Sequence, residues 1–331
     1  MSNRASVLQP GLQTTVQDYP GRVGHWRVGI PPSGPMDSLA FRLANLLVGN
    51  SPGAAALEMQ FTGPTLRFET AATIALTGGD CGATLAGAAV PHWRSLDVAA
   101  GQELRCPALR SGARAYLAIR GGIEKDPVLG SRATFPRGGV GGEALAAGAS
   151  LGWPDTDRPR HGWRVAPGRI PAYASEIEVA LTDGPHVDWL DEAGRATFLG
   201  AAWKVSGQSD RTGVRLVGPK LSFSRQAVDK PPEHGVDPSN VINTGYPIGG
   251  INLCGDTPII LPFDGPSQGG FITPYVVASA AMWKIGQARP GQILRFTRVP
   301  VDAAIELRFA LEAAASAASL EPVADGPAKV I

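Results

Sequence analysis

Two segments of the chain share one pattern: SGPMDSLAFRL at residues 33–43 and SGQSDRTGVRL at residues 206–216. Ser, Gly, Asp, Arg and Leu recur in both at the same spacing. Two further pairs follow in the same order, GPTLRF at 63–68 with GPKLSF at 218–223, and AGQELR at 100–105 with PGQILR at 290–295. Three ordered matches predict two related domains with insertions between the shared pieces.

The segments around these repeats predict a mainly β protein. The 42 glycines and 29 prolines suit many short strands joined by turns. Short apolar runs bounded by Gly, Asp or Pro are typical of buried strands, and a glycine turn before an alternating segment is typical of a hairpin arm. The strands we predict on these grounds cover residues 73–77, 99–104, 115–119, 177–181, 259–262 and 289–294.

One strong helix is predicted beside the first repeat. Residues 36–48 place apolar side chains at helical spacing, Ser33 or Asp37 can serve as the N-cap, and Gly49 ends the helix. The interval before the next repeated motif is shorter in the second half, so we expect the counterpart after Asp210 to be short or missing.

The repeats predict four parts: a first β domain at 1–157, a linker at 158–173, a second β domain at 174–300, and a C-terminal helix and tail at 301–331. The linker contains three prolines, and its Trp163 and Tyr173 predict that it is pinned rather than free. The Ala-rich segment 303–320 predicts a surface helix capped by Asp302, and residues 323–331 predict a frayed tail. Each β domain is expected to be an open barrel or a strongly curled sheet.

The composition excludes several classes of function. Thirty Lys and Arg balance 29 Asp and Glu, so no excess positive charge indicates nucleic-acid binding. Cys81, Cys106 and Cys254 are far apart and odd in number, which predicts reduced, mostly buried thiols in a cytoplasmic protein. The N-terminal residues contain no apolar signal region, and no apolar run is long enough to span a bilayer.

Common cofactor motifs are weak or missing. The loop at 138–142 is rich in glycine, but Glu143 stands where a phosphate-binding loop needs Lys, so a cleft-lining loop is the better interpretation. The five histidines form no HxH or HExxH pattern, which predicts no metal site, and no GxSxG elbow supports a Ser-His-Asp triad.

The loop DGPSQGGF at 264–271 is the strongest candidate site, because it is polar, rich in glycine and follows a buried strand. Asp264 can accept a proton, and the backbone N–H groups of Ser267, Gln268, Gly269 and Gly270 can bind an oxyanion.

Arg211 can pair with its neighbour Asp210 or hold a carboxylate or carbonyl, and the residues leave both possibilities open. Ser239 and Asn240 offer neutral hydrogen-bonding groups that suit an amide or urea-like substrate. We expect this loop to face a cleft between the two barrels, with Asn240 and Arg211 near its wall.

Several long motifs resemble one family, that of allophanate hydrolase subunit 2, KipA and the C subunit of 5-oxoprolinase, which includes the second half of the carboxyltransferase domain of urea carboxylase. The motifs are PGLQTTVQD at 10–18, GIPPSGPMD at 29–37, ANLLVGN at 44–50, LTG at 76–78, RGGI at 120–123, GSR at 130–132 and SDRTG at 209–213. Within the family, the motifs at 31–37, 238–240, 248–256 and 264–267 are most similar to urea carboxylase. Three positions depart from the usual patterns: Asp237 replaces His, Gln268 replaces an apolar residue, and Glu143 replaces Arg.

The resemblance implies two tandem cyclophilin-like β barrels and a carboxyltransferase-type subunit that transfers a carboxyl group from carboxybiotin to a urea-like or amide nitrogen. It adds Ser33 and Asp37 to the substrate-binding residues. It also implies a KipI-like partner, with a biotin carboxylase, a biotin carrier or a LamB-like subunit as further partners. Carboxybiotin would come from a partner, because AMWK at 281–284 is not a biotinylation sequence, and ATP would be used by the complex rather than bound by this chain.

Two other functions remain open from the sequence. The first is the C subunit of an ATP-dependent 5-oxoprolinase, which opens a lactam amide together with partner subunits. The second is a non-catalytic KipA-like regulator that acts by binding a KipI-like protein.

Overall fold

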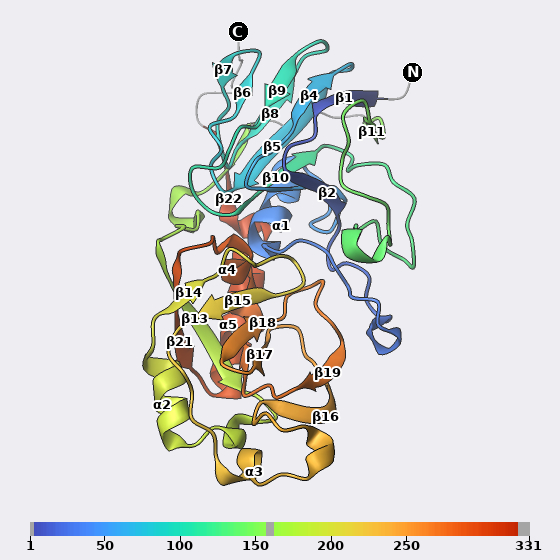
Figure 1. Ribbon diagram of the computed structural model, residues 1–331. Helices are drawn as coiled ribbons and strands as arrows, with labels where there is room; N and C mark the ends of the chain where they lie inside the picture. Colours follow the sequence, from blue (N-terminus) through green and yellow to red (C-terminus); the bar gives the residue numbers. More distant parts are fainter. Residues whose placement is uncertain (1–2, 157–161, 324–331) are drawn as a thin grey trace. The chain divides into compact units, whose positions relative to one another are not determined.

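The computed structural model describes residues 3–156 and 162–323, which fall into two compact units (Figure 1). Unit 1 consists of the described residues of Met1–Val23, Pro32–Tyr173 and Leu311–Ile331, and unit 2 of Gly24–Pro31 and Ala174–Ala310. The predicted domain boundaries at 157, 173 and 300 stay predictions. The expected tail from residue 324 onward and the linker residues 158–161 lie outside the described residues.

Unit 1 contains two antiparallel sheets and one long helix. The six-stranded sheet has the order β11 (Ser150–Trp153), β1 (Asn3–Gln9), β4 (Thr65–Phe68), β9 (Glu103–Arg105), β6 (Thr84–Leu85) and β7 (Ala88–Ala89). The five-stranded sheet has the order β2 (Gln13–Gln17), β3 (Ala56–Gln60), β10 (Arg114–Ile119), β5 (Ala72–Gly78) and β8 (Ser95–Val98). A separate pair joins β12 (Trp163–Val165) to β22 (Leu320–Pro322).

The central strands β5 and β10 are buried along almost their whole length, unlike strands with one wet face. One face of their sheet points into the core, and helix α1 (Ser38–Leu47) covers the other. The hydroxyl of Thr77 donates to the carbonyl of Ala40 at 2.7 Å, and the rings of Phe41 and Tyr116 meet edge to face at 5.8 Å. Burial on both faces explains why these strands read as continuous apolar runs.

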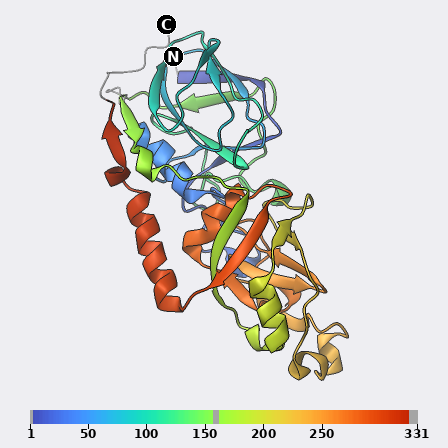
Figure 2. The ribbon, with the colours of Figure 1, turned by 90° about the vertical axis from the view of Figure 1, so that its left-hand side faces the viewer.

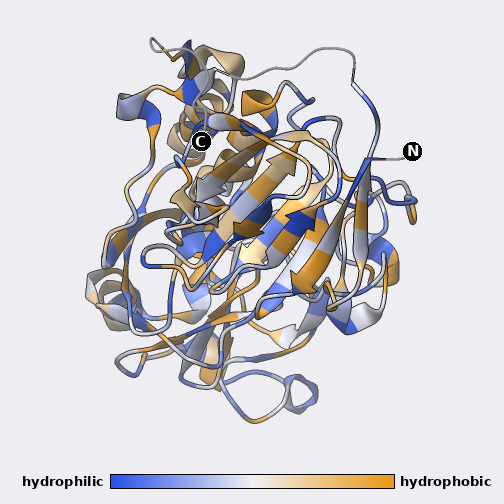
Figure 3. Cartoon of the chain, turned by 90° about the horizontal axis from the view of Figure 1, so that it is seen from above, coloured by the Kyte–Doolittle hydropathy of each residue, from blue (hydrophilic) through white to orange (hydrophobic). Residues whose placement is uncertain are grey.

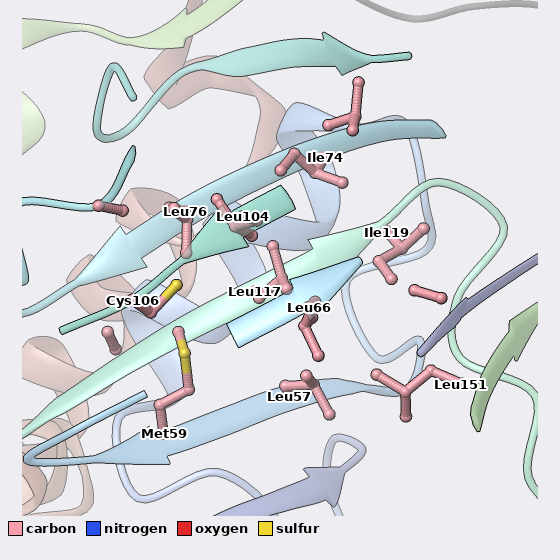
Figure 4. Close-up of a cluster of buried hydrophobic side chains, with 14 of the residues drawn as sticks. Leu57, Met59, Leu66, Ile74, Leu76, Leu104, Cys106, Leu117, Ile119 and Leu151 are labelled. Carbon is pink, nitrogen blue, oxygen red and sulfur yellow. The ribbon is translucent and has the colours of Figure 1, made fainter. Parts of the chain in front are cut away.

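The core of unit 1 lies between its two sheets. Figure 4 shows Leu57 and Met59 from β3 and Leu117 and Ile119 from β10 in one buried cluster with Leu66 of β4, which belongs to the other sheet. Figure 3 shows hydrophobic and hydrophilic residues alternating along many of the strands, the pattern expected when one face packs on a core.

Unit 2 is built on a closed seven-stranded barrel. Its first and last strands, β13 (Glu176–Asp183) and β21 (Ile293–Arg298), pair in parallel, and Figure 2 shows them side by side. The barrel order is β13, β20 (Tyr275–Val277), β17 (Gly250–Cys254), β18 (Thr257–Ile260), β15 (Val214–Val217), β14 (Trp203–Val205) and β21.

A small separate sheet in unit 2 pairs β16 (Asn240–Gly245) with β19 (Gln268–Phe271). The remaining α-helices are α2 (Glu192–Gly200), α3 (Arg225–Val228), α4 (Met282–Gln287) and α5 (Val301–Ala314). Short 3-10 turns occur at Trp26–Val28, Pro136–Gly138, Pro167–Arg169, Val187–Trp189, Pro232–His234, Ser279–Ala281 and Ala317–Ser319.

The expected fold class, mainly β with a few helices, is confirmed. The helix predicted at 36–48 is α1: the carboxylate of Asp37 accepts from the amide of Ala40 at 2.9 Å, so Asp37 rather than Ser33 is the cap. The counterpart segment, residues 210–217, contains no helix, because the chain enters β15 at Val214.

The internal repeat is only partly structural. Arg42 of the first motif lies in a helix, whereas its counterpart Arg215 lies in a strand; Leu66 lies in β4, whereas Leu221 lies in a loop. Only the third pair, around β9 and β21, adopts the same glycine turn followed by a strand. Two of the three sequence matches therefore do not mark equivalent elements, because tertiary packing overrides short local similarity.

The C-terminal helix is shorter than predicted. Helix α5 begins at Val301, so Asp302 lies in its first turn instead of capping it, and the helix ends at Ala314. The chain then turns so that β22 pairs with β12. The pairing of Trp163 with Pro322 and a hydrogen bond from the Tyr173 hydroxyl to Asp37 hold the later part of the predicted linker in place.

Across residues 3–156 and 162–323, no helix has both the length and the apolar character that a membrane crossing requires.

The aromatic centre of the barrel predicts a large effect for one substitution. Phe198 is fully buried, with its ring stacked on Tyr275 at 4.7 Å and on Phe296 at 5.2 Å. We expect Phe198→Ala to lower the free energy of unfolding by about 3–5 kcal/mol, because it leaves a cavity. Thermal and urea unfolding measure this loss. Phe309→Ala is the matched control, because Phe309 is 70% exposed and its removal should change stability by about 0.5 kcal/mol or less. Equal effects would contradict the assignment of the core.

Candidate functional site

A buried ion pair joins two of the predicted site residues. The guanidinium of Arg211 donates from Nε to Asp264 Oδ2 at 2.7 Å and from Nη2 to Oδ1 at 3.3 Å. The two side chains are only 5% and 2% exposed. This two-point contact matches the planar guanidinium to the planar carboxylate, and the backbone amide of Asp264 also donates to the carbonyl of Arg211 at 3.2 Å.

The local sequence explains how this pair forms. The carboxylate of Asp210 accepts from the Thr212 amide at 2.7 Å, the Thr212 hydroxyl at 2.6 Å and the Gly213 amide at 3.1 Å. Asp210 therefore holds a tight turn. Of the two possibilities left open for Arg211, the structure shows that it holds a carboxylate, that of Asp264.

This geometry gives Asp264 a structural task. Its carboxylate is removed from water, and both oxygens accept from Arg211. Removing either partner would leave a buried charge without compensation. A catalytic role for Asp264 and Arg211 stays a prediction.

The small sheet brings together four other predicted residues. Gly245 pairs with Gln268, Thr244 with Gly269 and Asn240 with Phe271, with an irregularity in β16 between Asn240 and Thr244. The next pair along is hydrogen-bonded, because the amide of Tyr246 donates to the carbonyl of Ser267 at 2.8 Å. In an antiparallel ladder such pairs alternate, so the amide of Gln268 points away from β16. The Gln268 side chain is exposed, and Ser267 and Gly270 are partly exposed.

The glycine at 269 has a packing explanation. A Cβ there would lie 2.8 Å from the ring of Tyr246, which is 6% exposed and lies against the strand. The Tyr246 hydroxyl accepts from the amide of Phe271 at 2.7 Å, and burial raises the pKa of Tyr246. Tyr246 thus sets the shape of β19, and the sequence analysis missed it.

Asn240 is held at the start of β16 by the turn before it. Asp237 accepts from the amide of Ser239 at 2.8 Å and from its hydroxyl at 2.6 Å, and these bonds lower the pKa of Asp237. Ser239 is fully buried, and its hydroxyl oxygen also accepts from the amide of Gly255 at 3.0 Å. The ammonium of Lys230 donates to the carbonyls of Asp237 and Asn240, the latter at 2.8 Å.

Ser33 and Asp37 lie in unit 1. Asp37 is completely buried as the cap of α1, and Ser33 adopts a positive φ of 56° in the turn before it. Gln17 anchors this turn, because its side-chain oxygen accepts from the amide of Gly34 at 3.0 Å. The hydroxyl of Ser33 is buried and has no hydrogen-bond partner in the described part of the chain.

A buried network that the sequence analysis missed surrounds the start of α1. One carboxylate oxygen of Glu58 accepts from the Met36 amide at 2.7 Å and from the Tyr116 hydroxyl at 2.8 Å, and Arg114 lies 3.5 Å from the other oxygen. The Tyr116 oxygen accepts from the Asp37 amide at 2.8 Å. Burial raises the pKa of Tyr116 well above its usual range, with Glu58 adding to the shift. These groups fix α1, and sequence spacing gave no signal for them.

A second missed cluster lies in the same unit. The ammonium of Lys125 donates to the hydroxyl of Thr134 at 2.7 Å, and the neighbouring Arg22 is 1% exposed. Burial and, to a smaller extent, the charge of Arg22 together lower the pKa of Lys125 to about 8, although Asp18 opposes the shift. The sequence feature that could have indicated Lys125 is the segment RGGIEK at 120–125, because it continues the family motif RGGI.

The histidines and cysteines form no metal-binding group among the described residues, but a hydrogen bond between Cys81 and Cys106 lowers the pKa of the Cys81 thiol and raises that of the Cys106 thiol. Burial lowers the pKa of His92 to about 4 and also lowers that of His186. Cys81 and Cys106 are buried, and all three thiols are free. Within residues 3–156 and 162–323, no group of three or more His, Cys, Asp or Glu could hold a metal ion.

Comparisons with known proteins give a consistent result. A family model described as "Carboxyltransferase domain, subdomain A and B" matches residues 28–298. The chain is 40% identical to the urea amidolyase of Saccharomyces cerevisiae over 314 residues, which covers 91% of this chain and 17% of that protein. It is 34% identical to the C subunit of 5-oxoprolinase from Escherichia coli, covering 91% of this chain and 93% of that one.

A solved structure has the same fold. The crystal structure of the K. lactis urea amidolyase matches with a TM-score of 0.90 at 38% identity, covering 96% of this chain and 20% of that chain. The chain spans only 17%, 18% and 25% of the length of the first three curated relatives it matches.

The buried ion pair gives a stability prediction. We expect Asp264→Asn to lower the free energy of unfolding by about 3 kcal/mol, because Arg211 keeps its buried charge and loses the opposite one. Chemical unfolding measures the change. Asp256→Asn is the control, because the pair of Asp256 with Lys220 is exposed and should contribute about 0–1 kcal/mol. A double substitution, Arg211→Met with Asp264→Leu, should recover most of the loss. If Asp264→Asn alone is neutral, the ion pair has no structural role.

The environment of Lys125 gives a pH prediction. Because its pKa is about 8 in the folded protein, a growing fraction of the amine is neutral and nucleophilic above pH 8. Pulse labelling with an acylating reagent, followed by peptide mass spectrometry, should show a rate that titrates near pH 8. In the urea-unfolded chain the same lysine should titrate near its ordinary value of about 10.4. Identical profiles in both states would contradict a depressed pKa.

Proposed function

Because the chain belongs to the family of carboxyltransferase domains, subdomains A and B, we propose that it is the carboxyltransferase-type subunit of a multi-subunit enzyme that carboxylates a urea-like or amide nitrogen. The observation that supports this most strongly is the match to the K. lactis urea amidolyase, which covers 96% of this chain at 38% identity. The urea amidolyases are several times longer, so the remaining functions would come from partner chains.

Neutral hydrogen-bonding groups of unit 2 would recognise the substrate. A urea-like group presents a carbonyl acceptor and N–H donors, and the carboxamide of Asn240 supplies the complementary donor and acceptor. Lys230, Asp237 and the pairing with Phe271 fix the backbone of Asn240, so little entropy is lost when the substrate binds. The buried hydroxyl of Ser239 stabilises this turn through its hydrogen bonds with Asp237 and Gly255.

The strand β19 would supply donors for developing negative charge. The Gln268 amide points away from the β16 ladder, and the exposed Gln268 side chain adds a second donor. Ser267, Gly269 and Gly270 shape the strand. Fixed donors of this kind stabilise an oxyanion because they need no reorganisation during the reaction. Arg211 and Asp264 belong to the proposed catalytic set as a pair whose rigid contact anchors the loop that leads into β19.

The donor set also fits carboxybiotin delivered by a partner, because its ureido carbonyl is a neutral acceptor and Gln268 offers neutral donors. When bound, carboxybiotin supplies the carboxyl group for transfer. The residues of this chain would hold the acceptor nitrogen close to that group and exclude water, which accelerates the reaction through proximity.

A second candidate function is that of the C subunit of a 5-oxoprolinase. The observation that favours it is length: the chain covers 93% of the E. coli protein of that name at 34% identity. Both functions require a second, KipI-like chain as partner, and they differ in the need for biotin.

The decisive assay uses the complex. The chain should be co-expressed with a KipI-like chain, a biotin carboxylase and a biotin carrier, and light scattering should show a stable hetero-complex. We expect ATP- and bicarbonate-dependent consumption of urea or a related amide that avidin abolishes. Hydrolysis of 5-oxoproline that avidin leaves unchanged would establish the second function instead. An assembled complex with neither activity would contradict both.

In the active complex, Asn240→Ala should lower kcat/KM about 10-fold or more, because hydrogen bonds to the substrate are lost. Asn243→Ala is the matched control: Asn243 is an exposed asparagine on the same strand. Its substitution should leave kcat/KM within a factor of two of wild type. Equal losses from the two variants would show that β16 as a whole, rather than Asn240, matters.

A further inference from the structure

Two cationic side chains lie together in unit 1, apart from the residues used in the proposed reaction. Lys125 and Arg22 are held by the same stretch of chain, residues 128–134. The ammonium of Lys125 donates to Thr134, and the guanidinium of Arg22 donates from Nε to the carbonyl of Val128 at 3.0 Å and from Nη2 to that of Ala133 at 2.6 Å.

Hydrogen bonds hold the backbone around Lys125 in place, but Thr134 uses only one of the three N–H donors of its ammonium among the described residues. The amides of Ile123 and Glu124 donate to Ala55 and Gly152 at 2.9 and 2.8 Å, and Arg132 Nε donates to the carbonyl of Lys125 at 2.7 Å. An ammonium has three N–H donors, and Thr134 takes one of them. No carboxylate forms an ion pair with Lys125 within residues 3–156 and 162–323.

The acidic group whose charge acts on Lys125, that of Asp18, has other partners. The carboxylate of Asp18 accepts from the Ser131 hydroxyl at 2.5 Å and from the Arg132 amide at 2.7 Å. It therefore holds the turn at 131–132 and does not pair with Lys125. A half-buried amine beside a buried guanidinium is electrostatically costly unless an anion balances the charge. Burial, and after it the charge of Arg22, lowers the pKa of Lys125, which agrees with this geometry.

The glycine-rich loop at 138–142 lies directly against both cations. A Cβ on Gly141 would lie 2.7 Å from Arg22 Nη2, so no other residue fits there. Gly142 has a φ of 83°, and a Cβ on it would lie 3.7 Å from Lys125 Nζ. Gly141 and Gly142 therefore bring the backbone of the loop close to the Lys125 ammonium, and neither residue places a side chain next to Nζ.

Thr134 connects this cluster to the turn at Ser33. Gln17 donates to the carbonyl of Thr134 at 3.0 Å and accepts from the amide of Gly34, and the amide of Arg22 donates to the carbonyl of Pro32 at 2.6 Å. The buried hydroxyl of Ser33, which has no partner among the described residues, therefore belongs to the same hydrogen-bonded region.

We propose that Lys125, supported by Arg22 and faced by the glycine-rich loop at 138–142, is a binding site for a small carboxylate-type oxyanion. The accessible charge is one ammonium, which suits a singly charged planar anion better than a polyphosphate. Two sources share this chemistry: bicarbonate, and the carboxylate of a small organic acid such as 5-oxoproline. The site is independent of the proposed reaction, since it needs only this chain.

Calorimetric titration of the full chain at neutral pH tests the proposal, with 5-oxoproline, bicarbonate and sodium chloride as probes at equal ionic strength. We expect saturable binding of at least one of the first two and none of chloride. 2-Pyrrolidinone, the same lactam without a carboxylate, should not bind if 5-oxoproline does. Lys125→Met should weaken binding at least 10-fold, and Lys204→Met, which removes an exposed lysine of β14, should leave it unchanged.

A second measurement keeps the test valid if Lys125→Met unfolds. In the wild-type chain, the bound probe should slow acylation of Lys125 at least 5-fold without slowing that of Lys204. Binding that survives Lys125→Met, or acylation of Lys125 that neither probe slows, would overturn the proposal. A lack of anion binding at Lys125 would not change the result of the avidin-sensitive assay of the complex. The anion site and the proposed carboxyltransferase function are therefore tested separately.

Discussion

Each unit buries charged side chains, and a buried charge is tolerated only when a partner of complementary geometry is buried with it. In unit 2 the partners are Arg211 and Asp264, which join the turn before β15 to the loop after β18. In unit 1 the carboxylate of Glu58 accepts from Tyr116 and from the backbone at the start of α1. These contacts tie loops to the sheets at positions where apolar packing alone would not define their conformation.

The same constraint separates structural from chemical roles among the polar residues of the loops. Asp264, Asp37 and Ser239 are buried and satisfied by neighbours, so their first task is to hold turns and helix ends. Gln268 is exposed on a strand whose neighbouring pairs are hydrogen-bonded, so its donors remain available. Lys125 is intermediate, because it is half-buried and only one of its donors has a partner among residues 3–156 and 162–323.

Family membership and chain length together define the functional question. The chain belongs to the carboxyltransferase domain family, yet it matches about a fifth of the length of a urea amidolyase and nearly the whole of a 5-oxoprolinase subunit. Under the proposed function, partner chains would supply the remaining chemistry. The physical element that would serve both functions is a rigid β scaffold that presents neutral donors and acceptors to an amide-like group.

The sequence by itself determined the family, the mainly β class, helix α1 with its Asp37 cap, and the polar loop at 264–271, because these depend on local patterns that a few neighbouring residues carry. Tertiary structure alone decided that Asp264 faces Arg211, that Tyr246 requires glycine at 269, and that Lys125 meets Arg22 and the loop at 138–142. It also gave the first two repeated motifs different secondary structures. The physical reason is that pairing across 53 residues, or 117 in the contact of Gln17 with Thr134, depends on which strands share a sheet, and no local pattern encodes that.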